Sequence, residues 1–312
     1  MRILRGHNAG RLEPRERVAA IGNFDGVHRG HQALVATARQ AAQPDQAVAV
    51  VTFEPHPREV FEAAAAPRRL MRVTDKATAL ARLGVDELVV LNFNPALRGM
   101  SPQAFATDVL AGALGVRHVV VGEGFRYGAR RAGDVDSLRA SGASLGFAVT
   151  EVAAVQCGET RISSTRVRSA VTDGDLAMAE ELLGRGFSLS GRVGYGQQLG
   201  RQLGFPTANL RMHPRAVNLS GIYAVRARGI PGLDGWADAV ASLGTRPTVG
   251  GVEPLLEVHV FDYAGNLYGR RLEVEFVARL RDEERFDSLP ALVAQMEADA
   301  LRARQILAAR AA

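Results

Sequence analysis

Residues 22–34 read GNFDGVHRGHQAL, and this stretch decides how the first half of the chain is interpreted. It lies where an apolar, strand-like run at Arg17–Ile21 ends and a helix-like stretch at Arg29–Ala42 begins. In a strand-to-helix turn the backbone amides and the positive end of the helix dipole favour an anion. The stretch therefore predicts an anion-binding turn.

Two glycines and two histidines give this turn its chemistry. Gly26 and Gly30 let the backbone approach a ligand closely. Because residues three apart share a helix face, His28 and His31 are both able to point at one phosphate group and donate hydrogen bonds to it. This chemistry suits adenylyl or other nucleotidyl transfer. The alternatives are an ordinary surface histidine pair, or a metal site with His56 as the nearest additional ligand.

Further strand-like and helix-like segments alternate through the first half of the chain. The other expected strands are Ala47–Phe53, Glu87–Phe93, His118–Val121 and Phe147–Val152. The other expected helices are Asp75–Leu83, Pro102–Leu114 and Asp134–Ser141. This alternation predicts βαβ units and a Rossmann-like parallel sheet, in which ligands bind beyond the carboxyl ends of the strands.

The pattern changes near residue 185, where the predicted domain boundary divides residues 1–185 from 186–312. Beyond it, Gly and Pro punctuate strand-like segments, and residues 272–276 alternate apolar and acidic side chains with period two. Such alternation is typical of half-buried antiparallel strands. We expect a small antiparallel barrel followed by one helix, from about Leu289 to Ala309.

Composition limits the possible cellular settings and partners. Of the 312 residues, 47% are hydrophobic and 23% charged, no apolar run is long enough to span a bilayer, and MRILRGHNAG at the start has no apolar core. The single cysteine, Cys157, excludes an intramolecular disulfide. These features predict a cytoplasmic protein with no membrane partner. The net charge is +5, yet the arginines are scattered and Lys76 is the only lysine, so we expect no nucleic-acid partner.

Four motifs of the first half resemble one known family. GNFDGVHRGHQAL is similar to the HxGH segment of the nucleotidyltransferase superfamily, and in particular to the adenylyltransferase module of bacterial bifunctional FAD synthetases. Three further segments resemble that module in order: TFEPHP at 52–57, VGEGFRYG at 121–128 and RISSTRVR at 161–168. The resemblance implies transfer of the adenylyl group of ATP to FMN, which gives FAD and pyrophosphate.

The same resemblance implies roles for individual residues. His28 and His31 are the implied catalytic pair, and Gly22, Asn23, Phe24 and Asp25 lie near the nucleotide. The residues implied to bind the triphosphate with the histidines are Arg161, Ser164, Thr165 and Arg168. One position departs from the family, which has Asp or Asn before the position of Phe125, whereas this chain has Gly124, with Glu123 as the nearest carboxylate.

A second motif, GFPTANL at 204–210, lies in the other half. Thr207 and Asn209 present two hard oxygen atoms at alternating positions, which suit Mg²⁺ shared with a nucleotide phosphate. The alternative is a structural turn at a strand entry. The motif resembles the PTAN segment of riboflavin kinases, and GIYAV, SLGTRPTVGG and LEVHVFDYAGNLYGRRLEVEF follow in that family's order.

The riboflavin kinase resemblance implies a six-stranded barrel with Glu257 as the base that accepts the proton of the ribityl hydroxyl. It also implies that Thr207 and Asn209 hold Mg²⁺. The residues implied to bind ATP and flavin are Gly200, Arg201, Gly204 and Pro206. Leu199 stands where the family often has a basic residue, and without the resemblance Glu257 is an ordinary polar strand residue.

Together these observations predict a bifunctional enzyme that converts riboflavin to FMN and FMN to FAD, with ATP as second substrate. One alternative is a riboflavin kinase whose adenylyltransferase is weakened or lost, for which Gly124 is the reason. Another is a basic RNA-binding protein on the same scaffolds. A relative of class I aminoacyl-tRNA synthetases is disfavoured, because the only lysine is far from the expected position.

Overall fold

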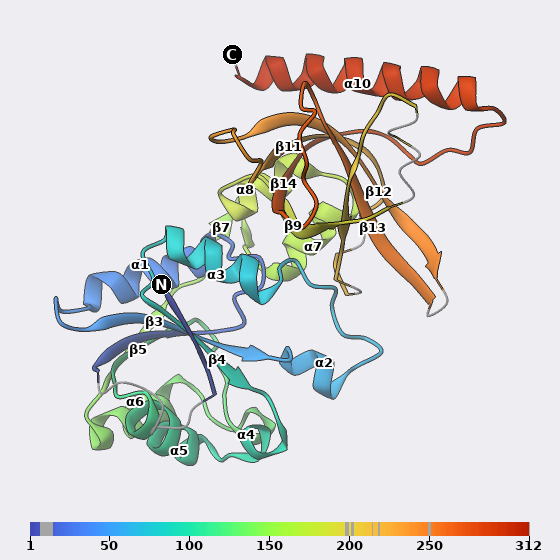
Figure 1. The fold of residues 1–312 in the computed structure, drawn as a ribbon. Helices are drawn as coiled ribbons and strands as arrows, with labels where there is room; N and C mark the ends of the chain where they lie inside the picture. Colours follow the sequence, from blue (N-terminus) through green and yellow to red (C-terminus); the bar gives the residue numbers. More distant parts are fainter. Residues whose placement is uncertain are drawn as a thin grey trace. The chain divides into compact units, whose positions relative to one another are not determined.

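The computed structural model describes residues 1–6, 15–196, 200, 203–213, 215–217, 219–248 and 251–311. The chain divides into two compact units (Figure 1). The first comprises Met1–Pro67 and Val73–Ser164, and the second comprises Arg68–Arg72 and Thr165–Ala312. The predicted domain boundary near residue 185 stays a prediction.

The first unit is built on a parallel sheet. Among the described residues it has six strands in the order β1-β4-β3-β2-β5-β6, and every pairing is parallel. The strands are β1 (Arg2–Arg5), β2 (Arg17–Ile21), β3 (Ala47–Glu54), β4 (Glu87–Asn92), β5 (Val116–Gly122) and β6 (Ala148–Val152). The predicted parallel sheet is confirmed. The strand β1, which sequence analysis missed, adds an edge beside β4.

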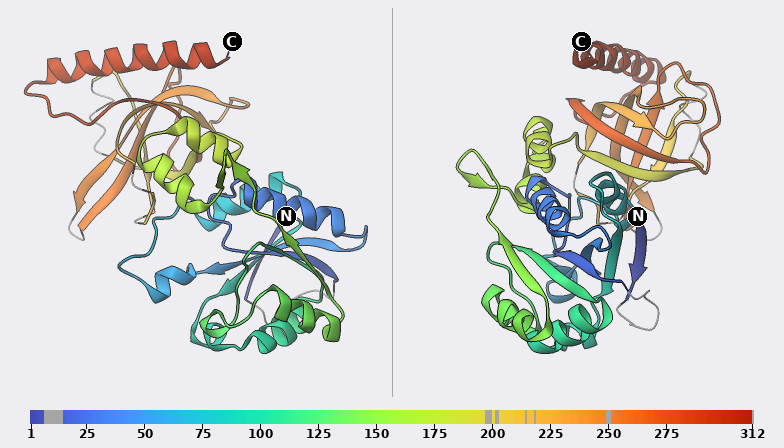
Figure 2. Two further views of the ribbon diagram at one scale, coloured as in Figure 1. Left: turned by 180° about the vertical axis from the view of Figure 1, so that it is seen from behind. Right: turned by 90° about the vertical axis from the view of Figure 1, so that its left-hand side faces the viewer.

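Helices cover both faces of this sheet (Figures 1 and 2). The helix α1 (Arg29–Ala41) packs on β2, β3 and β5, and the opposite face carries α5 (Pro102–Ala104), η2 (Phe105–Ala113) and α6 (Val135–Leu145). The remaining short elements are α2 (Pro57–Phe61), α3 (Val73–Arg82), α4 (Pro95–Gly99), η3 (Ala129–Arg131), β7 (Gln156–Cys157) and β8 (Thr160–Arg161). Burial on both faces explains why these strands are almost continuously apolar.

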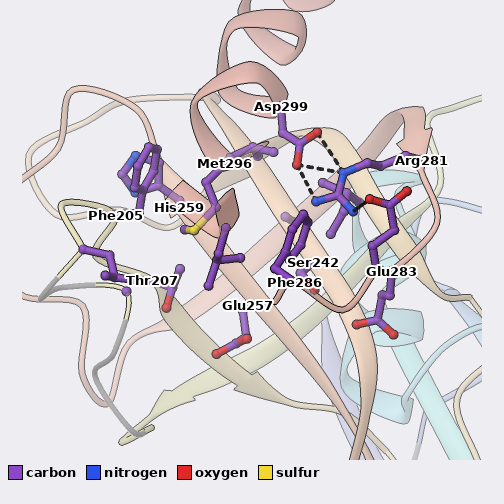
Figure 3. Close-up of a pocket in the computed structure, with 17 residues that line it drawn as sticks. Phe205, Thr207, Ser242, Glu257, His259, Arg281, Glu283, Phe286, Met296 and Asp299 are labelled. Carbon is purple, nitrogen blue, oxygen red and sulfur yellow. Dashed lines mark hydrogen bonds and ion pairs between the residues drawn. The ribbon is translucent and has the colours of Figure 1, made fainter. Parts of the chain in front are cut away.

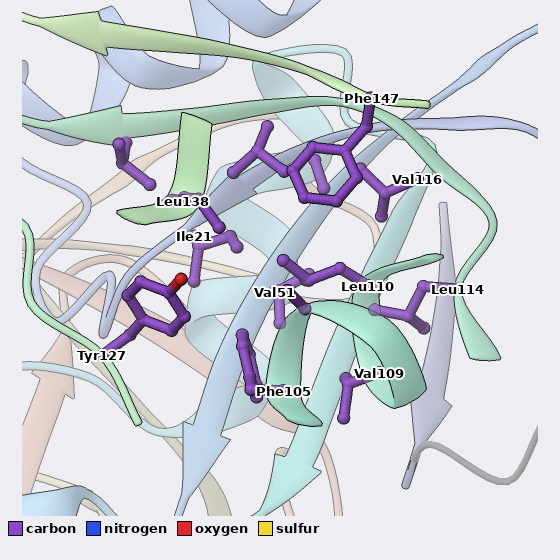
Figure 4. Close-up of a cluster of buried hydrophobic side chains, with 14 of the residues drawn as sticks. Ile21, Val51, Phe105, Val109, Leu110, Leu114, Val116, Tyr127, Leu138 and Phe147 are labelled. Carbon is purple, nitrogen blue, oxygen red and sulfur yellow. The ribbon is translucent and has the colours of Figure 1, made fainter. Parts of the chain in front are cut away.

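One face of the sheet and the helices below it enclose the main core of the unit (Figure 4). Ile21 and Val51 project from the strands and meet Phe105 and Leu110 of η2 and Leu138 of α6, all at most 5% exposed. Each such side chain contributes about 1.5–3 kcal/mol on burial. The core thus fixes the sheet against its helical layer.

The helix predicted at Pro102–Leu114 has a different geometry. Only its first turn, α5, is α-helical, and η2 is a π-helix with i→i+5 bonds such as Leu114 N to Val109 O at 3.0 Å. The buried positions 105, 106, 109, 110 and 114 have spacings that an α-helix would also give. The apolar pattern predicted a helix correctly but did not distinguish the π form.

The second unit contains the predicted barrel. In the described part of this unit, six strands close in the order β10-β13-β12-β11-β14-β9, with antiparallel pairing throughout. They are β9 (Ser188–Gly194), β10 (Ala208–Arg211), β11 (Gly221–Arg228), β12 (Ala237–Thr248), β13 (Gly251–Val260) and β14 (Arg271–Arg281). The helices are α7 (Ser164–Thr172), α8 (Leu176–Leu183) and α10 (Leu289–Ala311), which packs on the barrel through Ala303 and Leu307.

A buried ionic cluster joins three strands of the parallel sheet. Glu87 on β4 is fully buried and accepts hydrogen bonds from Arg17 Nε of β2 at 2.7 Å and from Arg2 Nη2 of β1 at 2.6 Å. Arg17, 2% exposed, also donates to Leu114 O at 2.8 Å. Burial raises the pKa of the Glu87 carboxyl, but the hydrogen bonds and charges of Arg2 and Arg17 outweigh burial and hold its pKa below the ordinary value.

We predict that Glu87→Gln destabilises the first unit by about 3 kcal/mol, because it leaves the Arg17 guanidinium buried without its counter-charge. Calorimetry is the suitable measurement, since the single tryptophan, Trp236, reports only on the second unit. Glu16→Gln is the matched control. It removes the same charge from an exposed ion pair with Arg117 and should leave stability unchanged.

The lowered pKa of Glu87 also fixes the direction of the pH effect. The stabilisation is complete above the carboxyl's unfolded pKa and is lost as the pH falls through the lower folded pKa. The stability difference between wild type and Glu87→Gln should therefore shrink in acid. A difference that stayed constant from neutral to acidic pH would contradict the role of this carboxylate.

Candidate functional sites

The turn between β2 and α1 has an unfavourable backbone conformation. Phe24 and Val27 have φ angles of 49° and 44°, and Gly26 lies between them at 87°. A left-handed conformation is costly for side chains with a Cβ, and most of all for a β-branched residue, at about 1–3 kcal/mol each. The surrounding structure must therefore hold this turn in place.

Side chains from β3, α3 and α7 hold two carbonyl groups of the turn. Asn23 O accepts hydrogen bonds from Thr52 Oγ1 at 3.0 Å and from Lys76 Nζ at 2.6 Å. Asp25 O accepts one from Ser164 Oγ at 2.8 Å. The predicted residue Ser164 is thus tied directly to the histidine-bearing turn.

The two predicted histidines lie together at the start of α1. His28 is the N-cap residue, and its Nδ1 accepts a hydrogen bond from the His31 backbone amide at 3.3 Å. A neutral His28 ring with Nδ1 as acceptor carries its proton on Nε2, which makes Nε2 a donor. The two rings stack with centroids 3.7 Å apart, and the Phe24 ring lies 4.8 Å from that of His31. Stacking fixes the direction in which both imidazoles point.

A cavity of about 260 Å³ adjoins this turn. Of the residues implied by the family resemblance, five line it: Gly22, His28, His31, Arg161 and Ser164. The side chains of Phe24 and Asp25 are buried beneath the turn at 0% and 5% exposure, and Asn23 is partly exposed. Thr165 and Arg168 belong to the second compact unit, so their approach to the histidines stays a prediction.

The loop after β5 contains the departure from the family pattern. Glu123 Oε2 accepts a hydrogen bond from the Ala154 amide at 3.0 Å, and Glu123 O accepts one from Arg161 Nη2 at 3.2 Å. Gly124 has a φ of 73°, and a Cβ built there meets no described atom within 4 Å. The Glu123 carboxylate therefore holds the backbone beside Arg161, and position 124 has room for a side chain.

An aromatic cluster that sequence analysis did not identify lies at the same edge of the sheet. Phe53 is the last residue but one of β3, and Phe93 directly follows β4. Their rings are 5.9 Å apart edge to face, and the Phe61 ring of α2 lies 5.7 Å from that of Phe93. Phe61 is 65% exposed. An exposed phenylalanine held against two others at the carboxyl ends of parallel strands is a surface on which a planar ring can stack. Only the proximity of Phe61 to the TFEPHP motif signalled it.

The barrel brings Asn209 and Glu257 together by strand register. Asn209 on β10 is paired with Glu257 on β13, which is paired in turn with Ser242 on β12. Directly paired residues have Cβ atoms about 4.5–5.5 Å apart. Leu256 and Val258 point into the barrel core, so Glu257 lies on the other face of its strand.

Asn209 has an unusual environment for a buried amide. The residue is 7% exposed, and its Oδ1 is buried with no hydrogen-bond partner in the described part of the chain. Its Nδ2 donates to Thr207 O at 3.4 Å. A buried amide oxygen without a donor is costly unless a ligand satisfies it. The Thr207–Asn209 pair therefore fits a Mg²⁺ ion, which prefers such oxygens.

A cavity of about 300 Å³ opens beside Glu257 (Figure 3). Its polar and charged lining residues are Thr207, Ser242, Glu257, His259, Arg281, Glu283, Glu284 and Asp299. Its apolar lining comprises Leu203, Phe205, Ile222, Val240, Phe286, Leu292 and Met296. Asp299 of α10 accepts hydrogen bonds from Arg281 Nε at 3.0 Å and Nη2 at 2.7 Å, which fastens the helix to the barrel beside the cavity.

The remaining residues predicted for the barrel site are Gly200, Arg201, Gly204 and Pro206. Gly200 lines the same cavity as Glu257, whereas Pro206 lines a second cavity of about 440 Å³ that Thr207 shares. Gly204 has a φ of 85°, which glycine adopts readily. Arg201 lies outside the described residues.

The histidine metal site that the sequence left open has no support where the structure describes the chain. No group of three or more His, Cys, Asp or Glu side chains is arranged to hold a metal ion in these residues. His56 instead caps α2 by accepting a hydrogen bond from the Arg58 amide at 3.2 Å. No helix in the described ranges has the length and apolarity needed to cross a bilayer.

Comparison with known proteins relates both halves to named families. Residues 11–166 match the FAD synthetase family model, and residues 183–307 match the riboflavin kinase model. A bifunctional riboflavin kinase/FMN adenylyltransferase of Pseudomonas fluorescens is 46% identical over 311 residues, which is 99% of this chain and 98% of that protein. The corresponding Escherichia coli K12 protein is 42% identical over 98% of this chain and 97% of its own length.

A solved structure has the same arrangement of elements. It is titled a macrolide-efflux protein from Streptococcus pneumoniae, and it matches with a TM-score of 0.81 at 30% identity over 97% of this chain and 98% of that one. The identity over nearly the full length, the two family models, and the parallel sheet and closed barrel all indicate the same family. The chain belongs to the family of bifunctional riboflavin kinases/FMN adenylyltransferases, which make FMN from riboflavin and FAD from FMN.

Proposed function

We propose that the two reactions use the two cavities described above, with residues 1–185 as the adenylyltransferase module and 186–312 as the kinase module. The observation that carries the assignment is the pairing of Asn209 with Glu257 in one half and the stacked His28–His31 pair at a helix start in the other. Each arrangement suits a different kind of attack on a phosphate.

In the first module, a phosphate oxygen of FMN attacks the α-phosphorus of ATP. A new P–O bond forms, the bond to the bridging oxygen breaks, and pyrophosphate leaves. His28 Nε2, His31 and the amides at the start of α1 donate hydrogen bonds to the developing charge. Arg161 and Ser164, which line the cavity, bind the triphosphate together with Thr165 and Arg168.

In the second module, Glu257 accepts the proton of the ribityl 5′-hydroxyl, whose oxygen attacks the γ-phosphorus of ATP as ADP leaves. Thr207 and Asn209 hold Mg²⁺, and the unsatisfied Asn209 Oδ1 supports this assignment. When bound, the ion neutralises charge on the phosphates. Gly200, Arg201, Gly204 and Pro206 contribute to binding ATP and the flavin.

Aromatic and apolar surfaces account for flavin recognition. In the first module the exposed Phe61 stacks on the isoalloxazine ring of FMN, supported by Phe53 and Phe93. In the second, the lining that includes Phe286 and Met296 receives the ring of riboflavin. The cytoplasmic location and the lack of a nucleic-acid partner stay predictions from the sequence.

We predict that replacing both His28 and His31 with alanine lowers FMN adenylylation by at least about 100-fold, because two donors to the transition state are lost. The measurement is a time course of riboflavin, FMN and FAD, separated by chromatography, with ATP and Mg²⁺. FMN formation in the same protein is the internal control and should not change. Undiminished FAD formation would refute the histidine assignment.

Glu257→Gln should reduce riboflavin phosphorylation by about 100- to 10,000-fold, since the amide cannot accept the hydroxyl proton. Conversion of added FMN to FAD should continue at the wild-type rate. Glu297→Gln, the same change on an exposed face of α10, serves as the matched control and should affect neither reaction. A normal kinase rate in Glu257→Gln would remove this residue as the base.

Phe61→Ala should raise the KM for FMN in adenylylation about five- to tenfold with little change in the KM for ATP, because a stacking surface for the flavin is lost. Leu301→Ala, which removes a side chain of similar exposure at 61%, is the control. Equal KM values for FMN in Phe61→Ala and wild type would show that the flavin ring binds elsewhere.

A further inference from the structure

Lys76 occupies a position unlike that of a surface lysine. It lies on α3 and is 6% exposed. Its Nζ donates to Asn23 O at 2.6 Å and lies 3.2 Å from Thr52 Oγ1, which itself donates to Asn23 O at 3.0 Å. These three contacts join α3, the end of β3 and the first residues of the histidine-bearing turn within one compact unit.

The choice of lysine at this position is informative. The chain has 38 basic residues, and Lys76 is the only lysine among them. A composition so strongly weighted toward arginine makes arginine the default cation of this chain. A compact ammonium group on a flexible stem fits a small buried space between two oxygens. A planar guanidinium in the same space would bring five N–H donors, each of which would need an acceptor.

The turn that Lys76 contacts needs support. Phe24 and Val27 both have left-handed backbone angles, and such conformations persist only where the surroundings over-determine them. Lys76 and Thr52 hold its first carbonyl, Ser164 holds the carbonyl of Asp25, and Gln32 Nε2 donates to Val27 O at 3.0 Å. The next residue is His28, whose ring direction depends on where this turn ends.

We propose that Lys76 is a positioning residue for adenylyl transfer. Its ammonium group acts through Asn23 O, keeps the strained turn in its observed conformation, and thereby orients His28 and His31. This inference rests on the proposed function of the two histidines. Because Lys76 works through the backbone, it affects the chemical step rather than the binding of either substrate.

The test is Lys76→Met, which keeps an unbranched apolar stem as far as Cε and removes the ammonium group with its charge and its donors. We expect kcat for FMN adenylylation to fall about 10- to 100-fold, as for a displacement of about 1 Å, while the KM values for ATP and FMN stay within about threefold. Riboflavin phosphorylation by the same protein should be unchanged. Arg82→Met, at an exposed position on the same helix, should change none of these values.

Two further measurements separate positioning from stability. The imidazole signals of ¹³C-labelled His28 and His31 should shift in folded Lys76→Met and not in Arg82→Met. If Lys76→Met does not fold, Thr52→Val removes the neighbouring anchor and should give a smaller fall in kcat with the same signal shifts. An unchanged kcat, a rise in KM alone, or unshifted signals in a folded variant would overturn the proposal. Full activity of the double histidine variant would instead overturn the proposed function.

Discussion

The first unit depends on one costly turn, between Ile21 and His28, at the carboxyl edge of its sheet. Two residues with side chains, Phe24 and Val27, hold left-handed angles there. Such a conformation requires fixed partners for its carbonyls, and the polar groups of Thr52, Lys76 and Ser164 supply them. The parallel sheet makes this possible, because β2 and β3 end side by side and bring Thr52 under the turn.

In the second unit, strand register brings the polar groups of the site together. A closed antiparallel barrel fixes strand register, and register alone places Asn209, Glu257 and Ser242 in one row across three strands. No strained turn is needed to bring these groups together. The closure of the sheet also leaves no open edge, so the position of Glu257 is set by pairing on both sides.

The sequence specified the elements better than it specified their contacts. Long apolar runs predicted β2 to β6 within two residues at each end. Alternation at residues 272–276, together with strand-like segments separated by Gly and Pro, predicted the antiparallel barrel. The strand β1 was missed because Arg2–Arg5 has only two adjacent apolar residues between two arginines, and its place comes from pairing with β4. The π form of η2 was missed because apolar spacing does not report hydrogen-bond register.

The site was predictable where a motif carried it and unpredictable where the fold assembled it. GNFDGVHRGH and GFPTANL marked the two histidines and the Thr207–Asn209 pair, all local in sequence. Lys76 and Asn23 are 53 positions apart in the sequence, and the helical pattern of α3 does not predict their contact. Phe61 was equally unpredictable, because an exposed phenylalanine indicates a stacking surface only once its contact with Phe93 is known.

The proposed function gives a reason for two scaffolds, because the two attacks on ATP have different requirements. The flavin hydroxyl must lose a proton to become a nucleophile, so the kinase site needs a carboxylate base close to a metal-binding oxygen. The FMN phosphate is already an anion, so the adenylyltransferase site needs no base and uses neutral donors at a helix start. On the proposed function, the acceptor's ionisation state therefore accounts for Glu257 in the barrel and for paired histidines in the sheet.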